Sequence, residues 1–361
     1  ECMDGRVRGL LQFYGANRSG RWAGRLVQVQ NLPRLNLSIK MQDLARKLVK
    51  QGDTDAIRLL FGSVPDTLSQ LIRTAFIPSP GNLFVDADFS AIEARVIAWL
   101  AGEEWELEVF RSHGKIYEAT ASQMFNVPIE KIVKGRPEYT LRQKGKVATL
   151  ALGYQGSTGA LIRMGALDRG LKEDELPGIV DLWRNTNQNI VQLWHRMERA
   201  AINVVASGHS EHVRGLTLAL EGSNFDNDKK QLFLTIKLPN GRKLYYAQPS
   251  LETNRFNRPS VTYMDRNQTS HEWQKTETYG GKLVENCVQA IARDCLAEKI
   301  EILEHTGYPV VFHVHDEVIC DLPANRASLD NVIEIMKKPI AWAPDLPLNA
   351  DGWTGKYFTK D

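Results

Sequence analysis

The stretch NLFVDADFSAIEAR, residues 82–95, constrains the fold more than any other part of the chain. Its first half is a short apolar run that predicts a buried strand, and Asp88 lies at the end of that strand. Ser90 and Glu93 have the spacing of a capping box, so we expect a helix to follow and to end near Gly102. This order of elements places the Asp88 carboxylate at the mouth of a sheet.

A second acid occupies a similar place near the C-terminus. Residues 309–322, PVVFHVHDEVICDL, predict an apolar hairpin that turns at His315 and Asp316. A carboxylate at the mouth of a buried sheet is costly unless it faces a cation or a donor. If Asp88 and Asp316 meet, two Mg²⁺ ions would relieve their repulsion and supply the arrangement used for in-line phosphoryl transfer. Taken singly, each acid is also consistent with a capped turn.

The third element is a helix predicted over residues 138–152, because chemically distinct side chains recur there at every fourth position. They are Arg142, Lys146, Leu150 and Tyr154. On a helix these positions form one slowly rotating stripe. Two cations followed by an apolar and an aromatic group match a nucleoside triphosphate laid along the helix. An amphipathic helix with a basic solvent edge is the alternative.

The remaining patterns indicate a mixed α+β protein. Helical periodicity covers residues 38–61, 115–126, 176–206 and 281–305. Residues 232–246 predict a hairpin that turns at Asn240-Gly241, and residues 26–30 alternate in the manner of an extended segment.

Composition and charge restrict the class of protein further. The 361 residues would suit two or three domains, and no apolar run approaches the ~20 residues that span a bilayer. Four sparse cysteines without a CxxC pair favour a reduced, cytoplasmic protein over a disulfide scaffold or a zinc ribbon; they are Cys2, Cys287, Cys295 and Cys320. The formal net charge is +2, but residues 1–50 carry +7. This basic arm either contacts phosphates or is a solvated face.

The three elements, in this order, resemble the motifs of family A DNA polymerases, the group of bacterial DNA polymerase I and many phage replicative enzymes. DFSAIEAR, which begins at Asp88, resembles the first palm motif. The spacing of Arg142, Lys146 and Tyr154 resembles the fingers helix, and the HDE sequence that begins at His315 resembles the palm hairpin. The amino-acid sequences of several segments resemble those of phage enzymes more than those of bacterial ones.

Further matches lie outside these three motifs. Arg21 in the sequence SGR and Asn31 in the sequence QNLP resemble the stretch that grips primer and template. Gln289 resembles the glutamine that precedes the last palm segment. The resemblance covers residues from about 5 to 358, and the ordered set is far more specific than any one motif.

The resemblance implies a role for each matching residue. Asp88 and Asp316, with the backbone carbonyl of Phe89, would bind two Mg²⁺ ions. The catalytic Lys146 and its neighbour Arg142 would hold the triphosphate of an incoming deoxynucleotide.

Other matches concern the sugar, the base and the DNA. Glu93 would exclude a 2′-hydroxyl, and Tyr154 would pack beside the templating position. The residues implied in primer-template binding are Arg21, Asn31, Arg95, Gln289, His315 and Glu317.

Three departures from the family pattern affect the nucleotide site. Leu150 stands where the family usually has Phe or Tyr against the sugar, which leaves discrimination against chain terminators open. Tyr117 stands where many members place a phosphate-contacting His, and a phenol brings a hydrogen bond without a charge. Tyr154 is followed by Gln155-Gly156 where the family usually has Gly directly, so the helix end is expected to differ.

The implied fold is α+β: a right-hand polymerase palm, built on an antiparallel sheet, with an inserted and mostly helical fingers subdomain. We expect the palm to comprise residues 1–110 and 271–361 and the fingers to comprise residues 111–270. The implied function is template-directed DNA synthesis in replication, with primer-template DNA and deoxynucleoside triphosphates as partners and no membrane.

Two alternatives remain at this point. One is an RNA-synthesising or reverse-transcribing relative, against which Glu93 argues. The other is a fragment that binds primer-template DNA but is inactive without a thumb. We expect the thumb and a proofreading domain to precede residue 1, because the chain begins with Glu rather than Met and well inside the family pattern.

Overall fold

The computed structural model describes residues 3–33, 37–226, 229–267 and 269–359, so Glu1, Cys2 and residues 34–36 of the basic arm lie outside it. The described strands form sheets of two, four and six strands. They are β1 (Leu11–Gln12), β2 (Ala23–Gly24), β3 (Asn82–Phe89), β4 (Glu211–Val213), β5 (Leu216–Asp226), β6 (Lys229–Lys237), β7 (Lys243–Thr253), β8 (Pro259–Arg266), β9 (Trp273–Thr278), β10 (Val310–Val314), β11 (Glu317–Pro323) and β12 (Ala350–Gly355).

Helices connect and cover these sheets. The α-helices are α1 (Ile39–Gln51), α2 (Thr54–Phe61), α3 (Val64–Leu71), α4 (Ile92–Ala101), α5 (Glu104–Ser112), α6 (Ile116–Phe125), α7 (Thr140–Leu152), α8 (Thr158–Arg163), α9 (Leu176–Thr186), α10 (Gln188–Ser207), α11 (Gly280–His305) and α12 (Leu329–Lys337). The 3₁₀ turns are η1 (Val29–Asn31), η2 (Ile72–Ala75), η3 (Ile129–Lys131), η4 (Pro137–Tyr139), η5 (Leu167–Arg169) and η6 (Glu173–Glu175).

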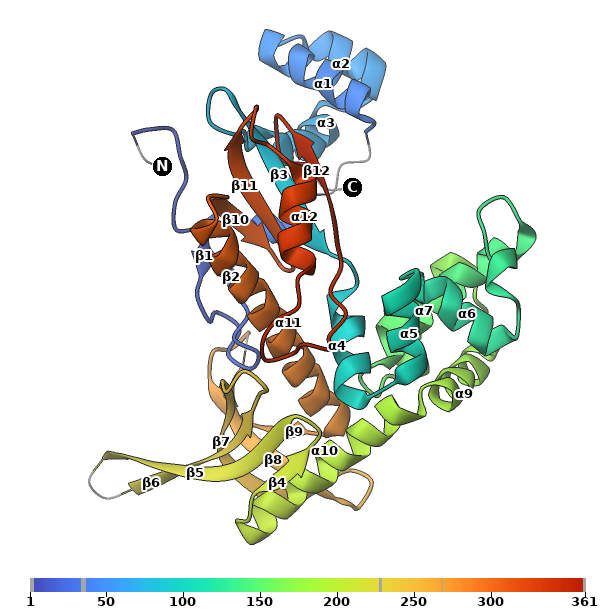
Figure 1. Ribbon diagram of the computed structural model, residues 1–361, viewed down its shortest axis with the longest axis vertical. Helices are drawn as coiled ribbons and strands as arrows, with labels where there is room; N and C mark the ends of the chain where they lie inside the picture. Colours follow the sequence, from blue (N-terminus) through green and yellow to red (C-terminus); the bar gives the residue numbers. More distant parts are fainter. Residues whose placement is uncertain (1–2, 34–36, 227–228, 268, 360–361) are drawn as a thin grey trace.

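The four-stranded sheet has the order β10-β11-β3-β12, and all its pairs are antiparallel. Its strands come from both ends of the chain, and the long inserted segment between β3 and β10 leaves the sheet and returns through α11 (Figure 1). The predicted hairpin is present, since β10 and β11 pair on either side of His315-Asp316. The predicted class, α+β with a divided antiparallel palm sheet, is confirmed.

Alternation along the strands separates two faces of this sheet. Val85 and Ala87 of β3, with Val318 of β11, are fully buried and join the main core with α11 and α12. Phe84 and Ile319 point to the opposite face, where they form a smaller core with Phe358 and other apolar groups. The acids at positions 88 and 317 share this second face, at the end of the sheet.

The inserted segment has a helical half and a sheet half. Helices α5 to α10 cover residues 104–207, and the six-stranded antiparallel meander β4 to β9 follows, packed on α10 (Figure 1). The helical character predicted for residues 111–270 therefore applies to the first part. The predicted hairpin at Asn240-Gly241 is present as β6 and β7, but it belongs to a larger sheet.

Two local predictions are wrong. Residues 26–30 do not extend, because Leu26 has a positive φ of 55° and a 3₁₀ turn begins at Val29. The capping box is absent: Ala91 is the N-cap of α4, with a left-handed φ of 52°, and no side chain bonds the cap. The helical periodicity of residues 38–61 is divided between two helices, because Gly52 ends α1 with a φ of 69° that glycine adopts without strain.

None of the helices in the described ranges combines the length and the apolar character that crossing a membrane requires.

Candidate active site

The two predicted carboxylates come to one end of the four-stranded sheet. The register pairs Glu317 with Asp88, and the Phe89 amide donates to the Asp316 carbonyl at 3.1 Å. His315 takes the left-handed region, with a φ of 54°, which lets a two-residue turn carry Asp316 next to the end of β3. Asp88 and Asp316 are both half-buried. Residues 228 positions apart in the sequence thus lie side by side.

The two cations of the predicted stripe on α7 lie beside α6. The Arg142 Nε donates to Glu118 Oε1 at 2.7 Å, and the guanidinium lies 5.5 Å from the centroid of the Tyr117 ring. The Lys146 ammonium is 5.7 Å from the same ring. Burial raises the pKa of Tyr117, with Arg142 acting against this rise. Tyr117 therefore stands between the two cations as a neutral phenol, at the position where the family places a histidine.

A polar chain connects the fingers helix to both palm motifs. The Tyr154 hydroxyl donates to Glu93 Oε2 at 2.9 Å, and Arg21 Nη1 lies 3.6 Å from Glu93 Oε1. Arg21 Nη2 also lies 3.1 Å from His315 Nδ1. Burial, followed by the neighbouring Glu93 charge, raises the pKa of Tyr154 well above its ordinary value, so the hydroxyl remains a donor. Four residues predicted from separate motifs are thus linked.

These elements enclose a cavity of about 360 Å³. Predicted site residues in its lining are Glu93, Tyr117, Leu150, Tyr154 and Asp316. An opening of this size, lined by aromatic rings, carboxylates and apolar side chains, accommodates a polar ligand with a planar ring.

At the end of α7, Gln155 stands where the resemblance implies glycine. Gln155 itself has a left-handed φ of 64°, and its side-chain oxygen accepts from the Gly281 amide at 2.9 Å. A Cβ atom on Gly281 would lie 2.4 Å from the Gln155 Cβ, so α11 begins in direct contact with this turn. The glutamine therefore fastens the fingers helix to the first turn of α11.

The other residues implied in DNA binding have different environments. Asn31 is exposed and donates to Gln28, and Gln289 is half-buried on α11 and donates to Glu285 at 3.3 Å. Arg95 is only 2% exposed, and it donates to the carbonyls of Ser90 and Pro347 at 2.7 and 2.8 Å. Because these carbonyls hold its guanidinium in the interior, Arg95 supports the start of α4 from within.

The sequence analysis missed the side chains that hold the basic arm in place. Arg18 makes a bidentate pair with Asp265, at 2.7 and 3.1 Å, and lies over the ring of Tyr263. Arg242 donates to Asp294 and to the carbonyl of Ser19. Asp265 lies on the inserted sheet and Arg242 in the connection between β6 and β7. Both are far from residues 18–19 in the sequence, so no local sequence pattern predicts these contacts. Together they fix the loop that carries Arg21.

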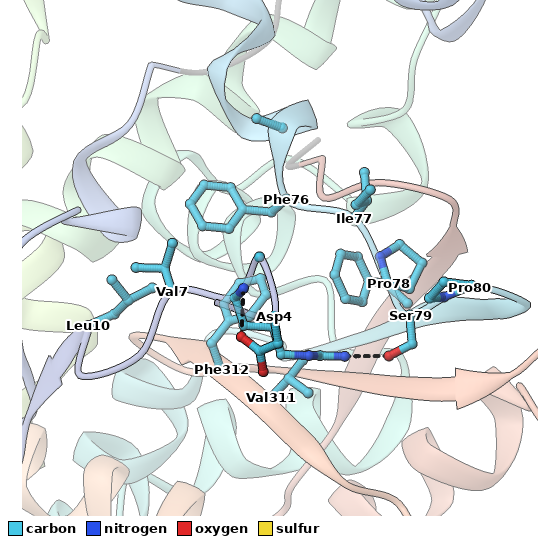
Figure 2. Close-up of a pocket in the computed structure, with 14 residues that line it drawn as sticks. Asp4, Val7, Leu10, Phe76, Ile77, Pro78, Ser79, Pro80, Val311 and Phe312 are labelled. Atoms are coloured by element: carbon cyan, nitrogen blue, oxygen red, sulfur yellow. Dashed lines mark hydrogen bonds between the residues drawn. The ribbon is translucent and has the colours of Figure 1, made fainter. Parts of the chain in front are cut away.

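A larger cavity, of about 420 Å³, lies away from this site (Figure 2). Its apolar lining includes Val7, Leu10, Phe76, Pro78 and Phe312, and none of the predicted site residues lines it. Its position, between the N-terminal segment and the loop before β3, makes it a packing crevice of the arm rather than part of the candidate site.

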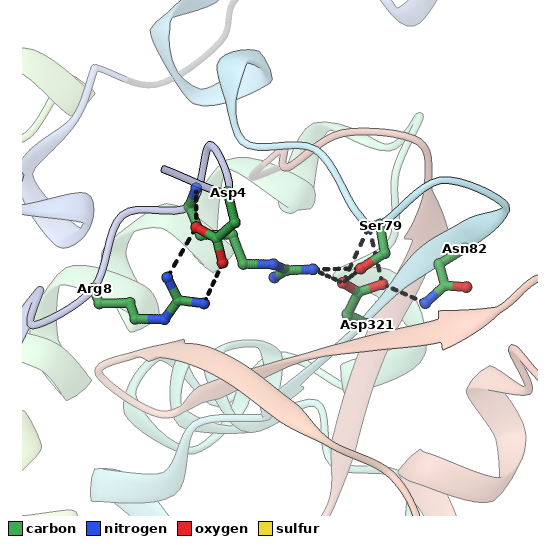
Figure 3. Close-up of polar contacts among 6 residues, drawn as sticks. Asp4, Arg8, Ser79, Asn82 and Asp321 are labelled. Carbon is green, nitrogen blue, oxygen red and sulfur yellow. Dashed lines mark hydrogen bonds and ion pairs between the residues drawn. The ribbon is translucent and has the colours of Figure 1, made fainter. Parts of the chain in front are cut away.

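Polar contacts close one side of that crevice (Figure 3). Asp321 on β11 accepts from Ser79 Oγ at 2.7 Å, from Asn82 Nδ2 at 2.8 Å and from Arg6 at 3.3 Å. Burial works against the Asp321 charge, but these bonds lower the pKa of the carboxyl. Asp4 accepts two bonds from Arg8 in the same segment. The N-terminal segment is thereby tied to the palm sheet.

The donor set at the sheet end suits a hard cation. Carboxylate oxygens from Asp88 and Asp316, with a backbone carbonyl nearby at Phe89, are the ligand types that Mg²⁺ prefers. Across the described part of the chain, no three or more His, Cys, Asp or Glu side chains converge as a ready metal-binding group.

Known proteins with similar sequences are DNA polymerases. Residues 61–201 match the model of DNA polymerase family A. The chain is 57% identical over its whole length to a DNA polymerase of Bacillus phage SP02, of which the match covers 54%. It is 24% identical, over 74% of its length, to DNA polymerase I A, chloroplastic/mitochondrial, of Arabidopsis thaliana, of which it covers 23%.

A solved structure has the same fold. It is the POL domain of Pol1 from M. smegmatis in complex with DNA primer-template and dNTP, with a TM-score of 0.60 and 18% identity. The match covers 99% of this chain and 48% of that chain. The chain thus spans about half the length of the phage relative and of this structural neighbour. Residues 61–201 thus match DNA polymerase family A, and the whole chain is similar to about half of a phage DNA polymerase.

Proposed function

We propose that this chain is the palm-and-fingers part of a template-directed DNA polymerase that adds deoxynucleotides to a primer 3′-end by two-metal phosphoryl transfer. The palm would comprise residues 1–110 and 271–361, and the fingers residues 111–270. It would act in phage replication in the host cytoplasm. The observation that carries the proposal is the meeting of Asp88 and Asp316 at one end of a sheet, beside a cavity that also contacts α7.

Asp88, Asp316 and the Phe89 carbonyl would hold two Mg²⁺ ions. Bound Mg²⁺ would activate the primer 3′-hydroxyl and offset charge on the departing pyrophosphate. The palm residues would fix where the attacking oxygen and the α-phosphate meet, because Asp88 ends β3 and the hairpin that pairs with β3 carries Asp316 at its turn. His315 and Glu317 would support the primer terminus beside them.

The fingers residues would bind the incoming nucleotide. Lys146 and Arg142 supply positive charge to the triphosphate, and Tyr117 between them would donate one hydrogen bond. Leu150, exposed on the same stripe, would contact the sugar. Tyr154, whose hydroxyl donates to Glu93, would pack beside the templating position.

Glu93 would select the sugar. Its carboxylate lies between Tyr154 and Arg21, so a 2′-hydroxyl would have to displace an existing partner. Arg21 and Gln289 would reach minor-groove acceptors, which every correct pair presents in a similar pattern, and Asn31 would contact the same duplex. Arg95 would position the start of α4, and with it Glu93, without touching DNA.

Primer extension by the 361-residue chain, with Mg²⁺ and all four deoxynucleotides, tests this proposal. We expect full-length product from the wild-type chain and none from Asp316→Asn. A wild-type rate retained by both Asp88→Asn and Asp316→Asn would show that the site has been misassigned.

A second candidate is a polymerase part that binds primer-template but needs an upstream thumb or exonuclease polypeptide. The observation that favours it is that the chain covers 54% of its phage relative. In that case the chain alone would retain primer-template in a gel-shift assay without extending it. Addition of the remaining part of the polymerase would restore extension.

Ribonucleotide incorporation separates DNA synthesis from RNA synthesis. The wild-type chain should strongly prefer deoxynucleotides. Glu93→Ala should reduce that preference, because the substitution removes the carboxylate that a 2′-hydroxyl would meet. Equal use of both sugars by the wild-type chain would favour an RNA-synthesising enzyme.

A further inference from the structure

Strand β12 brings a third carboxylate next to the predicted metal ligands. Its register with β3 pairs Asp351 with Asp88, and the register of β11 pairs Glu317 with Asp88 on the other side. Residues directly opposite one another in an antiparallel sheet point to the same face, with Cβ atoms about 4.5–5.5 Å apart. Glu317, Asp88 and Asp351 therefore form one row across three strands, which we call the acidic row.

The register that creates this row is fixed by close packing. A Cβ atom on Gly352 would lie 1.9 Å from the Asp86 carbonyl oxygen, so β12 approaches β3 at a distance that only glycine allows. The Ser90 amide donates to the Asn349 carbonyl at 2.9 Å, just beyond the paired strands. A slip of one residue would turn Asp351 toward the core face. The position of Asp351 is thus enforced by its neighbours.

Asp351 differs from the other two members of the row in its surroundings. Glu317 is buried and Asp88 is half-buried, whereas Asp351 is exposed. Within the described part of the chain, the Asp351 carboxylate takes part in no hydrogen bond or ion pair, although its backbone pairs with β3. Like charges directly opposite one another destabilise a sheet. A cation bound at Asp88 would turn this repulsion into attraction.

Mg²⁺ usually keeps several of its water ligands. A carboxylate on the neighbouring strand is well placed to accept a hydrogen bond from such a water, and it need not reach the ion itself. Groups of this kind, beyond the direct ligands, commonly change metal affinity by 10–100-fold.

We propose that Asp351 is a positioning residue of the metal site, which accepts a hydrogen bond from a cation-bound water and raises the affinity for the divalent cation. This inference rests on the proposed function, because it requires a cation at Asp88.

Mn²⁺ binding to the full 361-residue chain tests the inference without relying on activity. Electron paramagnetic resonance of free Mn²⁺, with primer-template present, gives the dissociation constant. We expect Asp351→Asn to weaken Mn²⁺ binding about 10-fold. Asp351→Glu should recover most of the affinity. Glu301→Gln removes the same charge from an exposed position on α11 and should leave the constant unchanged.

Primer extension gives a second readout. The Mg²⁺ concentration for half-maximal extension should rise in Asp351→Asn by the factor seen with Mn²⁺, and high Mg²⁺ should restore the lost rate. If Asp351→Asn binds Mn²⁺ as tightly as the wild-type chain while Asp88→Asn does not, the role of Asp351 is refuted and the metal site stands. If Asp88→Asn also leaves Mn²⁺ binding intact, the proposed metal site itself is refuted.

Discussion

Gly145 controls how closely helix α7 packs on α6. An added Cβ atom would lie 2.2 Å from the Tyr117 carbonyl oxygen, which is 1.2 Å inside the 3.4 Å at which ordinary contact begins. The nearest atoms are mostly backbone atoms of Tyr117 and Ala121, so the clash cannot be relieved by a rotamer change. Gly145→Ala must therefore push α7 away from α6, and it must move Arg142 and Lys146 relative to Tyr117.

Two opposing effects determine the magnitude. Overpacking costs about 1–3 kcal/mol, and replacing glycine by alanine inside a helix returns up to about 1 kcal/mol. We expect Gly145→Ala to lower the free energy of unfolding by about 1–2 kcal/mol in urea. Because a displacement of about 1 Å can cost 10²-fold in rate, kcat/KM for the deoxynucleotide should fall by about 10–100-fold.

Gly178→Ala is the matched control. Gly178 lies inside α9, and an added Cβ atom there would meet nothing within 4 Å. The Gly178→Ala variant should keep full activity, and its free energy of unfolding should rise by up to about 1 kcal/mol. If Gly145→Ala were as stable and as active as Gly178→Ala, the close contact between α6 and α7 would not position the nucleotide site.

Three further perturbations test other parts of the account. Burial lowers the pKa of His313 to about 4, whereas histidine in the unfolded chain has a pKa near 6.5. Between these two pH values the unfolded chain therefore binds more protons than the folded chain. Stability should fall by up to about 3 kcal/mol as the pH drops through that window, and urea unfolding of His313→Asn should lack this loss. Glu118→Gln replaces the charge-assisted bond to Arg142 by a neutral one and should lower the free energy of unfolding in urea by about 1 kcal/mol. An unchanged urea midpoint would contradict the pairing. Tyr154→Phe removes the bond to Glu93, so amide hydrogen exchange in α7 should accelerate; unchanged exchange would show that this bond does not hold the helix.

The elements that carry the site were predictable from the sequence because their signals are local. An apolar run that ends in Asp88, an apolar hairpin with Asp316 at its turn and a four-residue stripe along α7 each need no knowledge of distant contacts. All three are present; the hairpin turn lies at the end of β3 beside Asp88, and Asp316, Leu150 and Tyr154 line one cavity.

What the sequence did not reveal depends on pairing between distant segments. The capping box failed because Ala91 takes the left-handed region at the junction of β3 and α4, where the tertiary fold sets the backbone. The sheet β4 to β9 was foreseen only at its Asn240-Gly241 turn. Its outer strand β9 is mostly exposed and carries no apolar run. Asp351 was not predicted because its position beside Asp88 follows only from the register of β12 with β3.

The central claim is that Asp88 and Asp316 act together on one reaction. Single-turnover primer extension by Asp88→Asn, Asp316→Asn and the double variant tests it most directly, with primer-template binding measured in parallel. Groups that act as a unit are strongly non-additive. We therefore predict that each single variant loses at least about 10³-fold in rate, that the double variant loses little more, and that all three still bind primer-template. Losses that multiply in the double variant, or a single variant that keeps its rate, would contradict a shared two-metal site.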